Sequence, residues 1–252
     1  MKNTSKNTVL ITGGSAGIGF EIAKLLSEKG NHVIITGRDE GRLKKAAAQL
    51  KNVTAIRCDI SKEKDMDELI ERIKKDFPQM NILINNAGRA IAYKLLDENA
   101  NAYDKAKEEM QTNYFAVVRL IEKLLPQLKK QAESAIVNVS SVVAYVPGRI
   151  ATYSATKAAL HNYTQSLRMQ LEEISNVKVF ELVPPLVNTE LSKDIGGANG
   201  IHPSMVAEGL FKGLEKDEYE IHVGMTEDFY KLYLSSPAEA VRKMFNSRPV
   251  VK

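Results

Sequence analysis

Short runs of apolar, largely β-branched residues alternate with amphipathic stretches along almost the whole chain. A short apolar run predicts a buried strand, and an apolar stripe at helical spacing predicts a helix. Strands that alternate with helices form parallel sheets, because parallel neighbours need a crossover long enough to hold a helix. We therefore expect an α/β fold, a doubly wound parallel sheet flanked by helices on both faces.

The expected elements follow one another without an internal repeat or a Pro/Gly/Ser-rich linker. Strands are expected over Thr8–Ile11, Val33–Thr36, Val53–Arg57, Asn81–Ile84, Ala135–Val139, Val177–Val183 and Tyr219–Val223. Helices are expected over Ile18–Lys29, from an Asp39 cap to Leu50, and over about Lys64–Asp76, Ala102–Gln131, Tyr153–Ile174 and Pro203–Leu214, followed by a C-terminal helical region. Residues 1–252 are thus expected to form a single domain, with a substrate loop and lid at about 186–215 and a mobile loop over Ser192–Pro203.

Composition excludes several classes of protein. The formal charge is +4 with acidic and basic residues interleaved, so no basic stripe favours nucleic acid. The apolar run Val9–Ile11 is too short for a signal peptide, and no window approaches the roughly 18 apolar residues of a membrane span. The single cysteine, Cys58, excludes an intrachain disulfide. No metal-ligand spacing is found among the four histidines, which are His32, His161, His202 and His222. The sequence predicts a cytoplasmic protein without a metal site.

The first expected strand runs directly into the glycine-rich segment Thr12-Gly13-Gly14-Ser15-Ala16-Gly17-Ile18-Gly19, which opens a helix. Glycine permits a tight turn and lets the backbone approach a pyrophosphate closely. The helix N-terminus adds free N–H groups and a partial positive charge. This context, between the first strand and a helix, indicates a Rossmann-type dinucleotide site rather than an ordinary loop.

The spacing Thr-Gly-x-x-x-Gly-Ile-Gly resembles the compact branch of the short-chain dehydrogenase/reductase family, and the resemblance covers residues 8–189. Further motifs follow in the family's order: Asp59-Ile60, Asn85-Asn86-Ala87-Gly88, Asn113, Ser140-Ser141 and Tyr153-Ser154-Ala155-Thr156-Lys157. The run from Pro184 to Leu191, with the segment Tyr219–Met225, resembles a bacterial subgroup labelled after teichoic-acid D-alanylation operons. The family usually has Pro-Gly at this place, so Pro185 is a departure that stiffens the turn.

The resemblance implies a nicotinamide cofactor. The implied contact residues are Gly13, Ser15, Gly17, Ile18, Gly19, Arg38, Asp59, Ile60, Asn86, Ala87, Gly88, Tyr153, Lys157, Pro184, Val187 and Thr189. A carboxylate at the end of the second strand would bind a ribose 2′-hydroxyl, whereas arginine would pair with a 2′-phosphate. Gly37 replaces the acidic residue that selects NAD in the family, and Arg38 follows, so NADP(H) is favoured over NAD(H). The alternative has Arg38 solvated and Asp39 turned toward the ribose, although Asp39 is better placed as a helix cap.

Tyr153 and Lys157 are four residues apart and therefore share a helical face. A free tyrosine has a pKa of about 10, and a nearby ammonium favours its phenolate. The resemblance implies that Tyr153 is the general acid/base and that Ser141 hydrogen-bonds the substrate oxygen. It also implies that Asn113 supports a water molecule that links Lys157 to solvent. Ser140 remains the alternative to Ser141, because the family spacing to the tyrosine is thirteen residues and Ser141 lies twelve before it.

The function implied is an NADP(H)-dependent oxidoreductase that moves a hydride between the nicotinamide and a carbonyl or alcohol carbon of a small molecule. One alternative is a catalytically inactive NADP(H)-binding sensor or regulator, which is disfavoured because all four reacting positions are filled. Another is an epimerase or dehydratase of the extended branch, which has a different glycine spacing. The resemblance also implies a homodimer or homotetramer formed through the two long helices. The substrate pocket is expected around Arg89, Tyr93, the segment 141–153 and residues 186–201.

Overall fold

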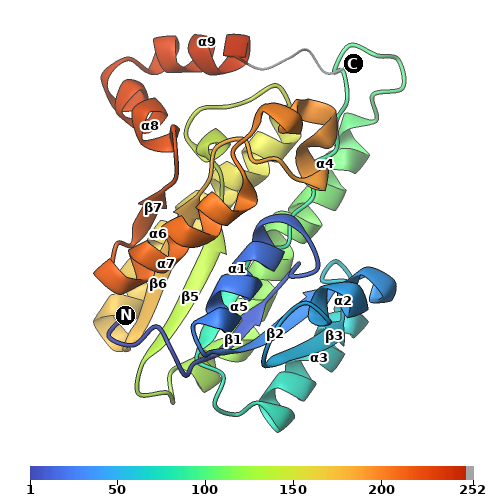
Figure 1. Ribbon diagram of the computed structural model, residues 1–252. Coiled ribbons are helices and arrows are strands. Elements are labelled where there is room, and N and C mark those ends of the chain that lie inside the picture. Colours follow the sequence, from blue (N-terminus) through green and yellow to red (C-terminus); the bar gives the residue numbers. More distant parts are fainter. Residues whose placement is uncertain (248–252) are drawn as a thin grey trace.

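A single parallel sheet organises the chain, which the computed structural model describes over residues 1–247 (Figure 1). Within these residues the strand order is β3-β2-β1-β4-β5-β6-β7. The strands are β1 (Thr8–Ile11), β2 (His32–Gly37), β3 (Val53–Arg57), β4 (Ile82–Asn85), β5 (Ser134–Val139), β6 (Val177–Val183) and β7 (Glu220–His222). Strand order reverses between the neighbours β1 and β4, and ligands of open α/β sheets bind beyond the carboxyl ends at such a point.

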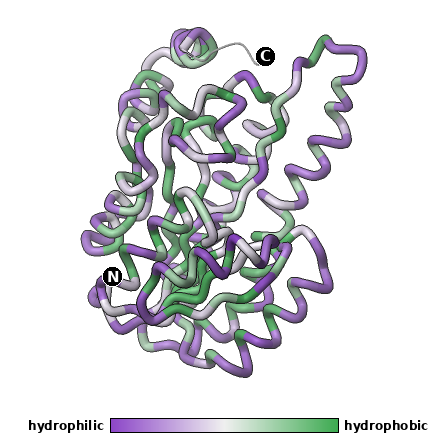
Figure 2. Tube along the Cα trace, turned by 45° about the vertical axis from the view of Figure 1, so that its right-hand side comes forward, coloured by the Kyte–Doolittle hydropathy of each residue, from purple (hydrophilic) through white to green (hydrophobic). Residues whose placement is uncertain are grey.

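Helices cover both faces of the sheet, which confirms the predicted fold class. One face carries α1 (Gly17–Glu28), α2 (Glu40–Ala47) and α7 (Pro203–Lys216). The opposite face carries α3 (Glu63–Asp76), α5 (Ala116–Leu128) and α6 (Ala151–Ile174), and α4 (Ala102–Met110) packs against α6. Figure 2 shows the resulting distribution, with the most hydrophobic tube in the strands at the centre.

The strands are apolar throughout because successive side chains enter two different cores. Val9 and Ile11 of β1 pack in the core beneath α1 and α7, while Leu10 packs in the core beneath α3 and α5. Side chains alternate between the faces of a strand, so a sheet with two buried faces needs apolar residues at every position. The bounds of β1, β3 and β6 match the predicted ones, and the other strands differ by one or two residues.

The predicted helix over Ala102–Gln131 ends at Leu128 in the structure, and its path also differs. Its helical path is divided into α4, a π-helical segment η1 (Gln111–Phe115) and α5. A π segment accommodates an extra residue in a turn, and such segments are frequent at functional sites. Asn113 lies in the middle of η1 and is buried, so the widened turn coincides with a predicted site residue.

The segment predicted as a mobile loop over Ser192–Pro203 contains ordered turns. Two 3-10 helices, η3 (Glu190–Ile195) and η4 (Gly197–Asn199), precede α7. Reciprocal bonds between Thr189 and Ser192 cap η3, which is the local reason that this turn forms.

After β7 come α8 (Thr226–Ser235) and α9 (Pro237–Ser247), in agreement with the predicted C-terminal helical region. The last five residues of the predicted domain, 248–252, lie outside the described residues. Within residues 1–247, no helix combines the length and the apolar character needed to span a bilayer.

The core beneath α1 and α7 can be tested at Phe180 on β6, because its large side chain is fully buried there. We expect Phe180→Ala to lower the free energy of unfolding by about 3–5 kcal/mol, since it removes buried surface and leaves a cavity. Urea unfolding would measure this change. Phe245→Ala, at a half-exposed position of α9, should cost less than about 1 kcal/mol. Equal losses at the two positions would contradict the placement of the core.

Candidate active site

The glycine-rich turn between β1 and α1 leaves no room for side chains at key positions. Gly13 and Gly17 have φ values of +68° and +57°, which only glycine adopts without strain. A Cβ on Gly19 would lie 2.3 Å from Asn86 Nδ2 and 2.4 Å from the carbonyl oxygen of Gly13. The turn is therefore packed directly against the segment that follows β4.

The N-terminal end of α1 fits an anionic group. Within the described chain, its N-cap Ala16 provides no side-chain cap, and its first turn contains no acidic residue. The first N–H groups of a helix lack intrahelical partners, and together with the helix dipole they attract phosphate. The residues present thus suit the pyrophosphate of a dinucleotide. The segment after β6 reaches the same turn, because Thr189 Cγ2 is 3.1 Å from the position of a Cβ on Gly17.

Thr12 joins the two strand-end turns, and the sequence reasoning had not singled it out as a site residue. Its Oγ1 accepts hydrogen bonds from the backbone N–H of Asn86 at 3.0 Å and of Ala87 at 3.1 Å. In return, Asn86 Nδ2 donates to the carbonyl oxygens of Thr12 at 2.9 Å and Gly13 at 3.2 Å. A hydroxyl immediately before the glycines was the only local signal for this role.

Asp39, Gly37 and Arg38 occupy the end of β2 and the start of α2. Asp39 accepts a hydrogen bond from the backbone N–H of Arg42 at 2.9 Å, so it caps α2 as predicted. A Cβ on Gly37 would lie 3.0 Å from Ser15 Oγ, which leaves little space for an acidic side chain. The Arg38 side chain is exposed.

Asp59 and Ile60 follow β3 at the same edge of the sheet. Burial raises the pKa of the Asp59 carboxyl, but hydrogen bonds from Ser61 and the charge of Arg38 outweigh burial, so this pKa lies below its ordinary value. Asp59 Oδ1 accepts from Ser61 N at 3.1 Å and from Ser61 Oγ at 2.7 Å. Ile60 is buried beside it. Asp59 and Arg38 therefore interact across the end of the sheet.

Lys157 lies deep in the site on α6. It is 4% exposed, and its Nζ donates to the carbonyl oxygen of Val139 at 2.8 Å. Nζ also lies 5.7 Å from the centre of the Tyr153 ring. Burial lowers the pKa of Lys157 to about 8, although the negative charge of Glu181 opposes that shift. The ammonium is thus poised to change charge just above neutral pH.

Asn113 connects the turn after β4 to α6. Its Oδ1 accepts from the Arg89 N–H at 2.8 Å, and its Nδ2 donates to the Arg89 carbonyl oxygen at 2.9 Å. Nδ2 also donates to Thr156 Oγ1 at 2.9 Å. A Cβ on Gly88 would lie 3.6 Å from Asn113 Oδ1 and 3.9 Å from Lys157 Nζ. The structure therefore brings these predicted residues together, and it adds Thr156, which sequence reasoning had not singled out.

Both candidate serines follow β5. Ser141 Oγ accepts from the Val143 N–H at 3.4 Å and caps the 3-10 turn η2 (Val142–Ala144). Ser140 Oγ is buried and has no hydrogen-bond partner among the described residues. Pro184 lies beside them after β6, and its carbonyl oxygen accepts from the Val142 N–H at 3.0 Å. The serines and the segment after β6 thus form one wall of the site.

Val187 and Thr189 continue this wall. Val187 is buried and forms an isolated parallel bridge with Ile201. The neighbouring Glu190 receives two bonds from Arg42, of 2.5 and 3.1 Å, which tie the start of η3 to α2. The predicted cofactor residues at the ends of β1, β2 and β6 therefore surround one region of the molecule.

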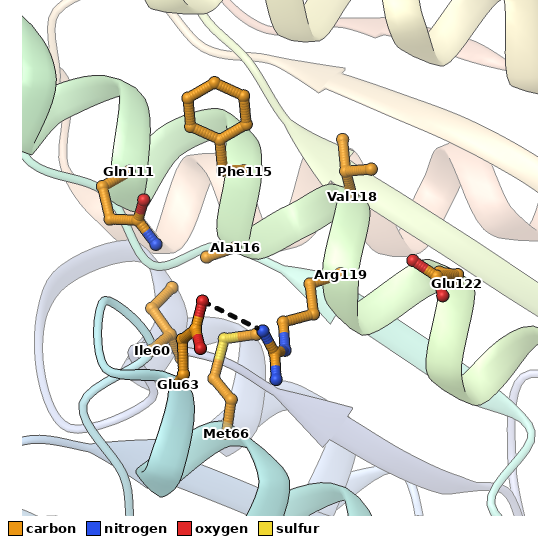
Figure 3. A pocket seen from close by; sticks show the side chains of 9 residues that line it. All are labelled: Ile60, Glu63, Met66, Gln111, Phe115, Ala116, Val118, Arg119 and Glu122. Carbon is orange, nitrogen blue, oxygen red and sulfur yellow. Dashed lines mark ion pairs between the residues drawn. The ribbon is translucent and has the colours of Figure 1, made fainter.

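A cavity of about 340 Å³ lies elsewhere, between α3 and the segment formed by η1 and α5 (Figure 3). It is lined by Ile60, Glu63, Met66, Gln111, Phe115, Ala116, Val118, Arg119 and Glu122. Its Arg119 is already ion-paired with Glu63 at 3.3 Å and with Asp67 at 2.7 Å. Of the described residues that line it, only Ile60 belongs to the predicted site, so we place the chemistry at the strand ends instead.

Comparisons with known proteins agree with this geometry. The model of the short chain dehydrogenase family matches residues 7–200. An uncharacterized oxidoreductase of Bacillus subtilis, DltE, is 41% identical over 222 residues, which are 87% of this chain and 83% of the relative. A Staphylococcus epidermidis oxidoreductase, also uncharacterized, is 30% identical over 90% of this chain and 97% of its own. The DltE match agrees with the bacterial subgroup predicted from the sequence.

Solved structures share the fold. A short-chain dehydrogenase from Burkholderia cenocepacia in complex with NADP superposes with a TM-score of 0.83 at 24% identity, over 96% of this chain and 98% of that chain. One from Sphingobium yanoikuyae in complex with NADPH gives 0.78 at 26% identity, over 94% and 95%. A Burkholderia phymatum protein in complex with NAD gives 0.84 at 20% identity, over 97% of each chain. The family model covers most of the chain, and this chain therefore belongs to the short-chain dehydrogenase family of oxidoreductases.

Proposed function

We propose that the protein is an NADP(H)-dependent oxidoreductase that interconverts a carbonyl and an alcohol on a small molecule, with Tyr153 as the general acid/base. The observation that carries this proposal is the approach of Lys157 to the Tyr153 ring, at 5.7 Å, next to Gly88 in the turn after β4. The same surroundings contain Asn113 and the two serines. A family fold alone hosts many functions, so the argument depends on these side chains.

Tyr153 donates and accepts the proton of the reaction. When bound, the reduced nicotinamide supplies a hydride to the carbonyl carbon. The Tyr153 hydroxyl donates its proton to the carbonyl oxygen, which completes the alcohol and leaves a phenolate. The Lys157 ammonium favours that phenolate through its charge. Ser141 holds the substrate oxygen by a hydrogen bond, with Ser140 as the alternative donor, and Asn113 supports the path by which the proton returns through Lys157.

The cofactor preference is proposed from the end of β2. Gly37 provides no carboxylate for a ribose 2′-hydroxyl, and Asp39 is used as the α2 cap. Arg38 remains as an exposed guanidinium that pairs with a 2′-phosphate. Related folds have been solved with NADP, NADPH and NAD, so the fold by itself does not choose between the cofactors.

We also propose a homo-oligomer formed through α4–α5 and α6. Phe115, in η1 between α4 and α5, is 53% exposed, and Met169 on α6 is 60% exposed. Large apolar side chains on two neighbouring helices suit contact with a second copy of the chain.

Replacement of Tyr153 by phenylalanine is the direct test of the chemistry. We expect Tyr153→Phe to lower kcat about 10²- to 10⁴-fold, because the ring stays and only the acid/base group is lost. The measurement follows NADPH and NADH absorbance over aldehydes, ketones and 3-oxoacyl thioesters. Tyr103→Phe, at an exposed position of α4, is the matched control and should keep wild-type rates. If the wild type binds NADPH tightly and turns over no carbonyl, the inactive sensor becomes the better explanation.

Arg38→Ala tests the cofactor preference. Loss of a charged hydrogen-bond partner should weaken NADPH binding about tenfold to a hundredfold, while NADH binding should stay unchanged. Fluorescence titration of both cofactors would measure the two dissociation constants. Arg72→Ala on α3 is the control, because its partner Asp76 lies on the same helix. Equal weakening of NADPH and NADH by Arg38→Ala would argue against phosphate recognition.

The depressed pKa of Lys157 predicts a pH dependence. Below about pH 8 its side chain is an ammonium, and above that value it becomes neutral. We therefore expect kcat/KM for carbonyl reduction to fall as the pH rises through about 8. Lys157→Arg keeps its charge at every accessible pH, so the remaining activity of this variant should lose the fall near that pH. An unchanged profile would assign the titration to another group.

A further inference from the structure

A row of polar side chains crosses the sheet on the face beneath α6. The parallel register pairs Asn85 with Asn138, Asn138 with Glu181, and Glu181 with Glu220. Residues paired in register on neighbouring strands project to the same face. Two carboxylates, Glu181 on β6 and Glu220 on β7, consequently lie side by side at the end of this row.

Two imidazoles contact these two carboxylates. His161 Nδ1 on α6 lies 2.8 Å from Glu181 Oε2, and His222 Nε2 lies 3.6 Å from Glu220 Oε1. The buried Lys157 ammonium also interacts with Glu181 through its charge. The Glu181 side chain is fully buried and that of Glu220 is 26% exposed, and two adjacent carboxylates in such surroundings are costly unless positive charge compensates them.

Glu181 has an unused ligand atom inside this group. Its side chain is 0% exposed, and its Oε1 has no hydrogen-bond partner among the described residues. One donor atom from each of His161, Glu181 and Glu220 can be chosen so that all three lie within 4.8 Å of one another. Tetrahedral zinc with ligands at about 2.0–2.2 Å holds its donor atoms about 3.3–3.6 Å apart, so side-chain movements of about an ångström would bring these groups into coordination.

We propose that His161, Glu181 and Glu220 bind a divalent first-row transition-metal ion. One imidazole nitrogen with carboxylate oxygens is a donor set that suits zinc or manganese, whereas calcium and magnesium prefer oxygen ligands alone. A divalent ion would neutralise the two carboxylates and would occupy the unused Oε1. No ligand spacing in the sequence predicts this site, because its residues come from α6, β6 and β7.

Neighbouring side chains orient the Glu220 carboxylate. The Tyr145 hydroxyl donates to Glu220 Oε1 and lies 3.2 Å from His222 Nε2. Glu227 in turn contacts His222 Nδ1 at 2.5 Å. Such outer hydrogen bonds orient metal ligands and keep them ionised.

The proposed metal site lies next to residues of the proposed active site. His161 lies one helical turn after Lys157 on α6. The Tyr145 ring, which follows the candidate serines, packs edge-on against the His161 ring with centroids 4.7 Å apart. A bound ion would therefore fix α6, which carries Tyr153 and Lys157, to β6 and β7.

Zinc binding to the full-length protein tests this proposal. After EDTA treatment and desalting, calorimetric titration with ZnCl2 should show one ion per chain, and the melting temperature should rise with zinc. MnCl2 is expected to bind, and MgCl2 to bind much more weakly. Glu181→Gln, which keeps the side-chain shape, should weaken zinc binding at least tenfold and abolish the rise in melting temperature. Cobalt substitution should give a visible absorption spectrum that the variant lacks.

Two control variants separate this site from surface binding. His202→Ala removes the exposed histidine that caps α7, and Glu215→Gln removes an exposed carboxylate, so both should bind zinc like the wild type. If Glu181→Gln does not fold, Glu220→Gln and His161→Gln must show the same loss. Absence of stoichiometric uptake by the wild type, or wild-type affinity in a folded ligand variant, would overturn the proposal. These readouts do not involve turnover, so they are independent of the proposed redox activity.

Discussion

The site depends on the hydrogen bonds that join the end of β1 to the turn after β4. Thr12 Oγ1 receives two backbone N–H groups, and Asn86 returns two bonds to the glycine turn. These bonds fix the two turns at the point where the strand order reverses. They place Gly88 beside Asn113 and Lys157, so the glycine turn and the reacting groups share one rigid edge.

Much of the fold could be predicted from local patterns. Strands such as β1 and β6 are apolar because both of their faces are buried, and this makes them recognisable in the sequence. Asp39 was recognisable as a cap because its partner, the Arg42 N–H, is only three residues away. The π segment at Gln111–Phe115 could not be predicted, since Asn113 there bonds to Arg89 and Thr156 at distant positions.

The same distinction applies to the candidate site. Tyr153 and Lys157 were identifiable because their motif follows the glycine turn and the Ser-Ser pair in the order of the family that the sequence resembles, and the structure places them close together. The depth of Lys157, which sets its pKa, follows from packing that no local pattern encodes. The neighbours Glu181 and Glu220 meet only through the register of β6 with β7. Such cross-strand pairs become visible once the order of the strands is known.

The contact between Gly37 and Ser15 constrains how this cofactor site can evolve. A Cβ at position 37 would lie 3.0 Å from Ser15 Oγ, so a side chain there requires Ser15 to shift by a few tenths of an ångström. The first substitution on a route toward a different nucleotide therefore carries a structural cost that a smaller residue at position 15 would relieve. Positions 15 and 37 are consequently expected to change together in the lineage of this protein.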